Sequence, residues 1–490
     1  MQGTVISLDI GTTHLKAALF DGSGALLRLE KEPTPSVPGE GGAVYDPAAF
    51  RAIVLGQLER LLEASPSVPA GICVTGMAEA GLILDKKTGE PKSELLPWFH
   101  PGPLPLADEL SAEESDRLFR STGLRSSFKY GIYKYRWLLS RLGLAPEGTI
   151  WLSVCDYIVF CLTGEYVTDP SFAARTYVYD VLSGRWDAER LTAYGLTCEN
   201  FPRVLPSGAP AGTFRGIPVA VGGHDHVCAA FGLLFSDPRG VCDSAGTSET
   251  YVGLLPRENL REGFPPESGL LYGPFVDGGF FFMGNVPSSG HSVEWFRKRL
   301  QLSPVEYREL DERTARLSSG PTGILYLPYL TGMGAPWYRP ELKAALLGVS
   351  EAHDGTQVLK AIFEGIQYQA RWLLEILEKA HGVSPGRIIC AGGSVKNRLM
   401  MQIKADVLNR EVSIPAQSEA TLSGCAALFL ERSLGRDAAA AFLAGAAADS
   451  ESYAPIPDAA SEYAEEYVRR YLPAVRAVSG LWEEHPEQKN

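Results

Sequence analysis

Two short segments of the chain have the composition of phosphate-binding hairpins. In the first, Asp9 precedes the turn Gly11-Thr12-Thr13, and in the second, Asp243 precedes the turn Gly246-Thr247. A turn of this kind directs backbone N–H groups and hydroxyls into one small concavity, which suits phosphate oxygens. One copy would indicate little, because Gly-Thr turns are common between strands. Two copies predict a duplicated half-fold that closes on a polyphosphate from both sides.

The first turn also carries an acid and a cation. Asp9 ends a predicted strand, where a carboxylate can hold Mg²⁺ through water, because this ion keeps much of its hydration shell. Thr12, Thr13 and Lys16 are placed to contact phosphate. The alternative interpretation is an ordinary hairpin turn with an exposed acid.

A third group of residues, Gly222-Gly223-His224-Asp225-His226, joins a predicted strand to a predicted helix. The glycines let a ligand approach the backbone, and a helix N-terminus favours an anion nearby. Asp225 is therefore a candidate general base for a substrate hydroxyl, and equally a candidate helix cap. His224 and His226 resemble a fragment of a metal site, but no third ligand motif accompanies them. Structural or substrate-contacting histidines are the favoured interpretation.

A fourth segment, Gly392-Gly393-Ser394, turns from a buried strand into a helix. Such a turn can pack flat against a purine, with Asn397 reaching its edge or the ribose; in isolation it is also an ordinary strand-to-helix turn. The chain has no G-x-x-x-x-G-K-[ST] loop and no G-x-G-x-x-G after a strand, which disfavours the two commonest nucleotide-binding solutions.

Strand and helix patterns are mixed along the chain, which predicts an α/β layer architecture with mixed sheets. The break at residues 236–240 marks the predicted boundary between a first domain, 1–238, and a second domain, 239–490. Residues 103–163 read mainly as helices, and 33–42 as a Pro/Gly loop. The other predicted strands are 4–10, 15–20, 25–30, 70–75, 217–223, 249–254 and 388–391. The predicted helices are 47–64, 226–234, 355–381 and 395–408. The C-terminal region is predicted to be helical and to fray after Trp482.

Composition narrows the class of protein. The chain has 490 residues and a net charge of −13, which argues against non-specific nucleic-acid binding. No apolar stretch approaches the roughly 18 residues of a membrane span, and the first residues lack a signal peptide's basic region. The eight cysteines are scattered without a C-x-x-C pair, as expected of reduced thiols in a cytoplasmic protein.

The order of these motifs resembles the FGGY family of carbohydrate kinases, within the actin-like ATPase superfamily. The resemblance covers residue 4 to about residue 435. Further matching segments are Leu162-Thr163-Gly164-Glu165, Thr168-Asp169-Pro170-Ser171, Arg175-Thr176, residues 290–297, residues 326–330, Ala335-Pro336 and Phe363-Glu364-Gly365.

The resemblance implies two RNase H-like domains with mixed five-stranded sheets, flanking helices and a central cleft. It implies a sugar bound mainly by the first domain and Mg²⁺-ATP bound mainly by the second. Asp9 resembles the family's Mg²⁺-linked acid, and Asp225 its general base. The remaining matches are Thr12, Thr13 and Lys16 for the first phosphate loop, Gly246 and Thr247 for the second, and Gly290, Gly393 and Asn397 for the nucleotide site.

The substrate segment departs from the family pattern. Xylulokinases have a Met-His pair where this chain has Met77 and Glu79, and glycerol kinases have an Arg-Glu pair of which only the acid is present. Trp98 is kept, but His100 replaces the usual Asp. Glu79 and His100 are predicted to bind substrate hydroxyls, with Met77 and Trp98 beside them and Lys134 lining the pocket; the alternative is that Glu79 and His100 contact no ligand.

The leading hypothesis is ATP-dependent phosphorylation of a ketose, such as a pentulose. An alternative within the family is a kinase of a polyol, such as glycerol or a tetritol. An alternative of another class is a nucleotide-binding sensor without catalysis, which the retention of both Asp9 and Asp225 disfavours. A homodimer is an expectation from the family alone.

Overall fold

The computed structural model describes residues 3–107, 110–260, 268–300, 319–382, 384–446 and 451–482, together with residues 309, 312, 313 and 317. Within these ranges no helix is both long and apolar enough to cross a bilayer. All eight cysteines are free thiols, and six of them are buried. The predicted frayed tail lies outside the described residues.

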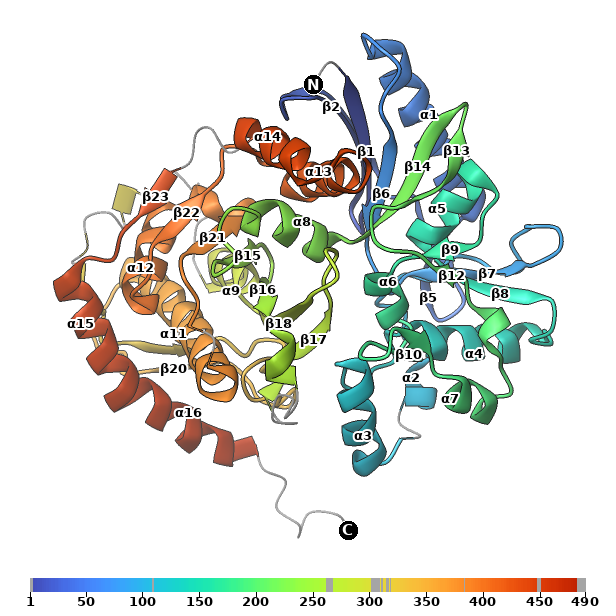
Figure 1. Ribbon diagram of the computed structural model, residues 1–490. Coiled ribbons are helices and arrows are strands. Elements are labelled where there is room, and N and C mark those ends of the chain that lie inside the picture. The colour runs from blue at the N-terminus through green and yellow to red at the C-terminus, as the bar shows by residue number, and fades with distance from the viewer. Residues whose placement is uncertain are drawn as a thin grey trace, which may run out of the picture.

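The N-terminal half is built on a mixed sheet (Figure 1, blue to green). An antiparallel hairpin lies on one side of its central strand, and two parallel strands lie on the other. In sheet order the strands are β13 (Pro210–Phe214), β14 (Ile217–His224), β6 (Ile72–Gly76), β1 (Thr4–Ile10), β2 (His14–Asp21) and β3 (Leu26–Pro33).

The C-terminal half repeats this pattern. Its central strand again has an antiparallel hairpin on one side and two parallel strands on the other. In sheet order the strands are β17 (Leu271–Pro274), β18 (Phe280–Val286), β16 (Glu249–Leu255), β15 (Val241–Ala245), β21 (Ile388–Ala391), β22 (Val412–Ile414) and β23 (Glu451–Tyr453).

The resemblance implied five strands in each sheet. The sequence patterns predicted five strands of the first sheet but neither β18 nor β22 of the second, and both sheets are wider than five strands. Within the described ranges the first has six strands and the second seven, so the predicted number was wrong. The additional strands β13, β17 and β23 all pair antiparallel with an edge of the five-stranded unit. They cover backbone N–H and C=O groups that an open edge would leave unpaired.

Two helices, α8 (Asp225–Leu234) and α13 (Ala420–Leu434), form a layer between the sheets. Their apolar side chains share one core with Val5 and Phe20 of the first sheet and Val252 and Ile389 of the second. Alternate residues of the same strands point the other way, because side chains of a strand alternate between faces. In β1, for example, Ile6 and Leu8 face the core under α1 (Pro47–Ala64) and α5 (Val154–Thr163).

The far face of the second sheet is covered by α11 (Gly355–His381) and α12 (Arg398–Leu408) (Figure 1). Helix α12 begins three residues later than predicted, because residues Gly393–Lys396 form a 3₁₀ turn. The remaining α-helices of the described residues are α2 (Leu104–Ala107), α3 (Ala112–Thr122), α4 (Gly131–Leu142), α6 (Pro170–Ala174), α7 (Ala188–Ala193), α9 (Gly290–Trp295), α14 (Arg436–Ala446), α15 (Pro457–Glu466) and α16 (Leu472–Ser479).

Short two-stranded sheets complete the fold and include two departures from prediction. The predicted loop at 33–42 contains part of a hairpin whose turn places Gly41 at φ +80°, and the mainly helical region 103–163 contains a fully buried strand. An apolar run as short as Ile150-Trp151-Leu152 fits either a strand or a buried helix. The pairs are β4 (Ser36–Gly39) with β5 (Gly42–Tyr45), β7 (Gly81–Asp85) with β8 (Thr149–Ser153), β9 (Val167–Thr168) with β12 (Arg203–Val204), β10 (Tyr179–Asp180) with β11 (Arg185–Trp186), and β19 (Leu325–Leu327) with β20 (Ala345–Leu347).

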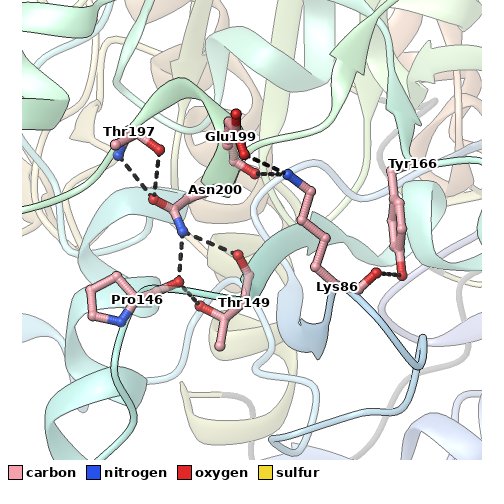
Figure 2. Close-up of polar contacts among 7 residues, drawn as sticks. All are labelled: Lys86, Pro146, Thr149, Tyr166, Thr197, Glu199 and Asn200. Carbon is pink, nitrogen blue, oxygen red and sulfur yellow. Dashed lines mark hydrogen bonds and ion pairs between the residues drawn. The ribbon is translucent and has the colours of Figure 1, made fainter.

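The β7–β8 pair is tied to the chain that follows α7 by a local polar network (Figure 2). Asn200 Nδ2 donates to the carbonyls of Pro146 and Thr149, at 2.8 and 3.1 Å. Lys86 Nζ pairs with Glu199 at 3.2 Å. These contacts satisfy backbone carbonyls at the start of β8 and fix the outer part of the N-terminal half, away from the cavities described below.

Candidate active site

The two predicted phosphate hairpins border one cavity of about 220 Å³. Lys16 of β2 lines it from the first hairpin, and Asp243 and Ser244 of β15 line it from the second. Asp225, at the start of α8, and Glu419, at the start of α13, line it as well. Side chains of both hairpins therefore border one space together with the catalytic candidate Asp225, although the turn residues Thr12, Thr13, Gly246 and Thr247 are not among those that line it.

Asp9 is the acid of the first hairpin, and one of its oxygens is open. Its Oδ1 is buried without a hydrogen-bond partner. Burial, together with the nearby charge of Asp225, raises the pKa of Asp9 to about 7, although Lys16 acts in the opposite sense. Lys16 itself is engaged elsewhere, because its Nζ lies 2.7 Å from Glu419 Oε2. A buried carboxylate with a free oxygen beside a second acid fits a divalent cation.

Asp225 is positioned by the turn from β14 into α8. Gly223 has φ +128°, and a side chain there would press against Ser171 and Asp169. Asp225 is the first residue of the helix rather than its cap, which is His224 without a side-chain capping bond. Its Oδ1 accepts from the backbone N–H of His226 at 2.6 Å.

The histidines on either side of Asp225 control its charge. His224 Nε2 lies 3.1 Å from Asp225 Oδ1. Burial works to raise the pKa of Asp225, but His226 and His224 outweigh it and hold that pKa well below the ordinary value. Ligand atoms of the three residues lie within 4.8 Å of one another. At neutral pH, Asp225 is thus an ionised carboxylate held in place by its neighbours.

The five residues predicted for the second phosphate loop and the nucleotide meet at a second cavity, of about 560 Å³. Gly290 N donates to Gly246 O at 3.1 Å, and a Cβ at position 290 would lie only 2.4 Å from that oxygen. Asn397 Oδ1 accepts from Met400 N at 2.8 Å, so this side chain also caps α12. The lining residues that were predicted are Gly246, Thr247, Gly290, Gly393 and Asn397.

A third cavity, of about 320 Å³, lies against the other side of Asp225's helix turn. Both halves of the chain line it, for example Glu79 and Trp98 from the first and Asn285 and Tyr338 from the second. His226 lines this cavity and the one between the hairpins, which places the two spaces side by side.

The polar contacts of this third cavity link the substrate segment to the first hairpin. Glu79 Oε1 lies 3.3 Å from Arg175 Nη1. Burial opposes the ionisation of Glu79, but Arg175 and then His224 hold its pKa below the usual value. Trp98 Nε1 donates to Thr12 Oγ1 at 3.0 Å, and Thr12 in turn contacts the buried Met77 through its sulfur at 3.7 Å. Thr13, by contrast, is exposed at the tip of the turn.

His100 is not brought to this cavity. It is fully buried, and its ring packs 5.2 Å from that of Trp137. Gly102 N donates to Nδ1 at 3.1 Å, so the proton resides on Nε2, which donates to Glu40 O at 3.1 Å. With both ring nitrogens bound to backbone, His100 holds two loops together and has no free atom for a substrate hydroxyl.

Lys134 of α4 lies behind the cavity wall. It is fully buried, and burial lowers its pKa to about 7 although Glu79 opposes the shift. Its Nζ donates to the carbonyls of Trp98, at 3.3 Å, and of Lys129. Lys134 therefore fixes the backbone of two lining residues instead of lining the pocket itself.

Sequence reasoning missed the charged contacts of the second hairpin. Asp243 bonds to Lys404 Nζ, which also lies 3.3 Å from Glu249 Oε2, and all three residues are fully buried. Glu249 accepts from Ser289 Oγ at 2.9 Å, and Ser289 adjoins Gly290 of the second cavity. The repeated acid before each Gly-Thr turn was a signal for Asp243. The sequence carries no such signal for Lys404, because the spacing of apolar residues in its helix does not indicate that a lysine is buried.

Lys129 and Arg175 were also missed as lining residues. Arg175 was part of a matching motif but had no role assigned, and Lys129 precedes α4 in a segment without any recognised pattern.

Comparisons with known proteins agree with this geometry. The N-terminal domain model of the FGGY family of carbohydrate kinases matches residues 4–232, and the C-terminal domain model matches residues 243–430. A glycerol kinase of Shewanella amazonensis is 32% identical over 447 residues, covering 86% of this chain and 89% of the relative.

Solved structures show the same fold. A gluconate kinase from Lactobacillus acidophilus superposes with a TM-score of 0.87 at 20% identity, covering 98% of this chain and 99% of that one. A xylulose kinase from Brucella ovis superposes with a TM-score of 0.84 at 23% identity, covering 97% and 100%. The chain, with two hairpins, an acid between them and two adjoining cavities, therefore belongs to the FGGY family of carbohydrate kinases, phosphotransferases that act on an alcohol group.

Proposed function

We propose that this kinase transfers the γ-phosphoryl group of ATP to a hydroxyl of a ketose, such as a pentulose, with Asp225 as the general base. The observation that carries the proposal is the position of Asp225. It lines the cavity between the two phosphate hairpins, and its neighbour His226 lines both this cavity and the one beside Glu79. A hydroxyl presented from the Glu79 side would face phosphate at this carboxylate.

Asp225 suits phosphoryl transfer because this reaction demands little of its base. The transition state is loose, so the base mainly orients the attacking hydroxyl and takes its proton late. His224 and His226 keep the pKa of Asp225 low despite its burial, so the carboxylate is ionised at neutral pH. Two bonds, from His226 N–H and His224 Nε2, fix its orientation.

The residues present also fit Mg²⁺. Asp9, with its open Oδ1, and Asp225 would hold the ion, and the donors are the carboxylate oxygens that this ion prefers. When bound, Mg²⁺ neutralises phosphate charge during transfer. Lys16 lies at the same cavity, where its ammonium can move from Glu419 to a phosphate oxygen.

A polyol substrate is the second candidate, favoured by the sequence relationship to glycerol kinase. Glu79 is consistent with either substrate, because a carboxylate accepts hydrogen bonds from any hydroxylated chain. A sensor without catalysis is disfavoured, since the ionised Asp225 and the open Asp9 both point to retained chemistry.

The test is ADP release with Mg²⁺-ATP across ketopentoses, tetritols and glycerol, for the parent protein and Asp225→Asn. We expect one class of acceptor to be phosphorylated and the variant to lose about 100- to 10,000-fold in kcat. ATP affinity, measured by calorimetry, should change little. Retention of most of the rate by Asp225→Asn would show that another group deprotonates the hydroxyl.

A further inference from the structure

The third cavity, which lies beside Glu79 and is the proposed substrate site, is lined by more positive than negative side chains. Arg125, Lys129 and Arg175 line it, and Glu79 is the one carboxylate among its described lining residues. A cavity that binds a neutral sugar needs side chains that form hydrogen bonds with the sugar's hydroxyls, and one cation or one anion can each do so. The excess of cations therefore calls for a separate explanation.

Two of the three cations have a carboxylate partner. Arg175 Nη1 lies 3.3 Å from Glu79, and Arg125 Nη1 lies 2.7 Å from Asp116. Lys129 differs from both. Within the described part of the chain, no carboxylate lies within ion-pair distance of its ammonium, which sits 5.0 Å from the centroid of the Trp98 ring.

Lys129 is held at the cavity by buried structure. The Nζ of Lys134, which is fully buried, donates to the carbonyl of Lys129 and, at 3.3 Å, to the carbonyl of Trp98. The buried Lys134 side chain thus fixes the backbone of both Lys129 and Trp98. Trp98 is anchored a second time through Thr12. The fixed backbone of Lys129 and the anchored Trp98 ring define where the Lys129 ammonium lies in the cavity, which suits a ligand-binding role.

We infer that the substrate of this kinase carries a carboxylate, which Lys129 binds over the face of Trp98 while Glu79 accepts hydrogen bonds from hydroxyls of the same molecule. The inference rests on the phosphoryl transfer and the general base of the proposed function, and it names an acid as the acceptor in place of the neutral pentulose given there. The substrate class is a sugar acid: an open hydroxylated chain, with or without a keto group, that ends in a carboxylate.

The charges favour a carboxylate over a phosphate group. A carboxylate brings one negative charge, which the one lysine without a carboxylate partner matches. A phosphate ester brings between about 1.5 and 2 charges at neutral pH. The second charge would oppose Glu79 in the same cavity, and Arg175 and Arg125 are already paired with acids.

The experiment compares matched probes that differ only at one end of the chain. Xylonate is tested against xylitol, and gluconate against glucitol, with xylulose and the 5-phosphates of the same sugars as further arms. ADP release gives kcat/KM, and calorimetry gives binding of each probe without ATP. The variants are Lys129→Met, Lys129→Arg and, as a control, Lys87→Met, an exposed lysine in the turn after β7.

We expect acids to exceed their neutral partners by about 10- to 100-fold in kcat/KM, the range of one charge-assisted hydrogen bond. Lys129→Met should remove that preference, mainly through KM, whereas Lys129→Arg and Lys87→Met should keep it. Preferential binding of acids without ADP release would support the inference and contradict the proposed kinase reaction with these acceptors. Equal or better use of neutral probes, a preference for the phosphates, a preference unchanged in Lys129→Met, or binding of none of the acids would overturn the inference.

Discussion

The two phosphate hairpins have the same strand pairing and sequence pattern, but their acids have different partners. In the first hairpin Asp9 has an open oxygen, and the hairpin's own cation, Lys16, is paired with Glu419. In the second hairpin Asp243 also keeps one open oxygen, but its other oxygen is bonded to the buried Lys404. One acid is left uncompensated, and the other is neutralised.

The difference shows that a repeated motif preserves geometry while its neighbours decide the role of each copy. A buried carboxylate without a partner costs stability and is retained where a ligand supplies the missing charge. A carboxylate paired with a buried ammonium belongs to the core, because removing either partner leaves a buried charge. We therefore expect Asp9 to matter for activity and Asp243 for folding.

Within this comparison of the two hairpins, replacement of Asp9 should have the largest effect on catalysis. We expect Asp9→Asn to lower kcat/KM about 1,000-fold, because in the proposed reaction the charge of Asp9 would hold Mg²⁺, which is worth several kcal/mol in the transition state. The Tm without nucleotide should stay the same or rise. Asp243→Asn is the matched variant, and its Tm should fall. If both variants lost stability equally, the two acids would not differ in role.

Replacement of Lys404 should have the largest effect on folding. Burial by itself lowers the pKa of Lys404, but Asp243 and Glu249 raise it above the ordinary value, so the residue is charged. Lys404→Met would leave two buried carboxylates uncompensated and should cost about 3–5 kcal/mol. Denaturant unfolding measures this loss, with Lys379→Met on the exposed face of α11 as the control. If the free energy of unfolding fell no more than in the control, the ion pair would not stabilise the core.

The stability of the parent protein and that of Asp9→Asn should depend differently on pH. The pKa of Asp9 is raised to about 7, so the folded state keeps a proton that the unfolded state releases near pH 4. The contribution of this proton to the free energy of unfolding has its full value below the pKa of the unfolded state. It is lost as the pH rises through the pKa of the folded state. Without Mg²⁺ or nucleotide, the Tm of Asp9→Asn should therefore rise relative to the Tm of the parent between about pH 4 and pH 7. A constant difference across this range would contradict the raised pKa.

Release of Lys16 should have the smallest effect. Glu419→Gln removes the partner 2.7 Å from Lys16, which is then free to contact phosphate. Partly exposed ion pairs are worth about 0–1 kcal/mol. We expect the KM for ATP to fall by about two- to fivefold, with kcat nearly unchanged. A rise in KM would mean that Glu419 helps to hold the nucleotide.

Much of the fold and half of the site could be predicted because they depend on local patterns. Gly-Thr turns, strand alternation and the Gly-Gly turn are local, and they identified the hairpins and all five residues predicted for the nucleotide cavity. His100 was assigned from its place beside Trp98, yet its ring turns toward the backbone of Glu40 and Gly102. Lys404, Lys134 and Lys129 act through partners distant in sequence, and no local pattern records such contacts.

The helix layer between the sheets has a consequence for how this chain can be divided. Helix α13 comes late in the sequence but packs on β1 and β6, and the ring of Phe429 fills the space beside Gly71. A fragment that ended at residue 238 would lack this helix and expose Val5, Cys73 and their neighbours. The two halves are thus neighbours in sequence without being independent folding units. Separately expressed pieces should become stable only when they reassemble, which makes position 238 a natural site for a split, self-complementing kinase.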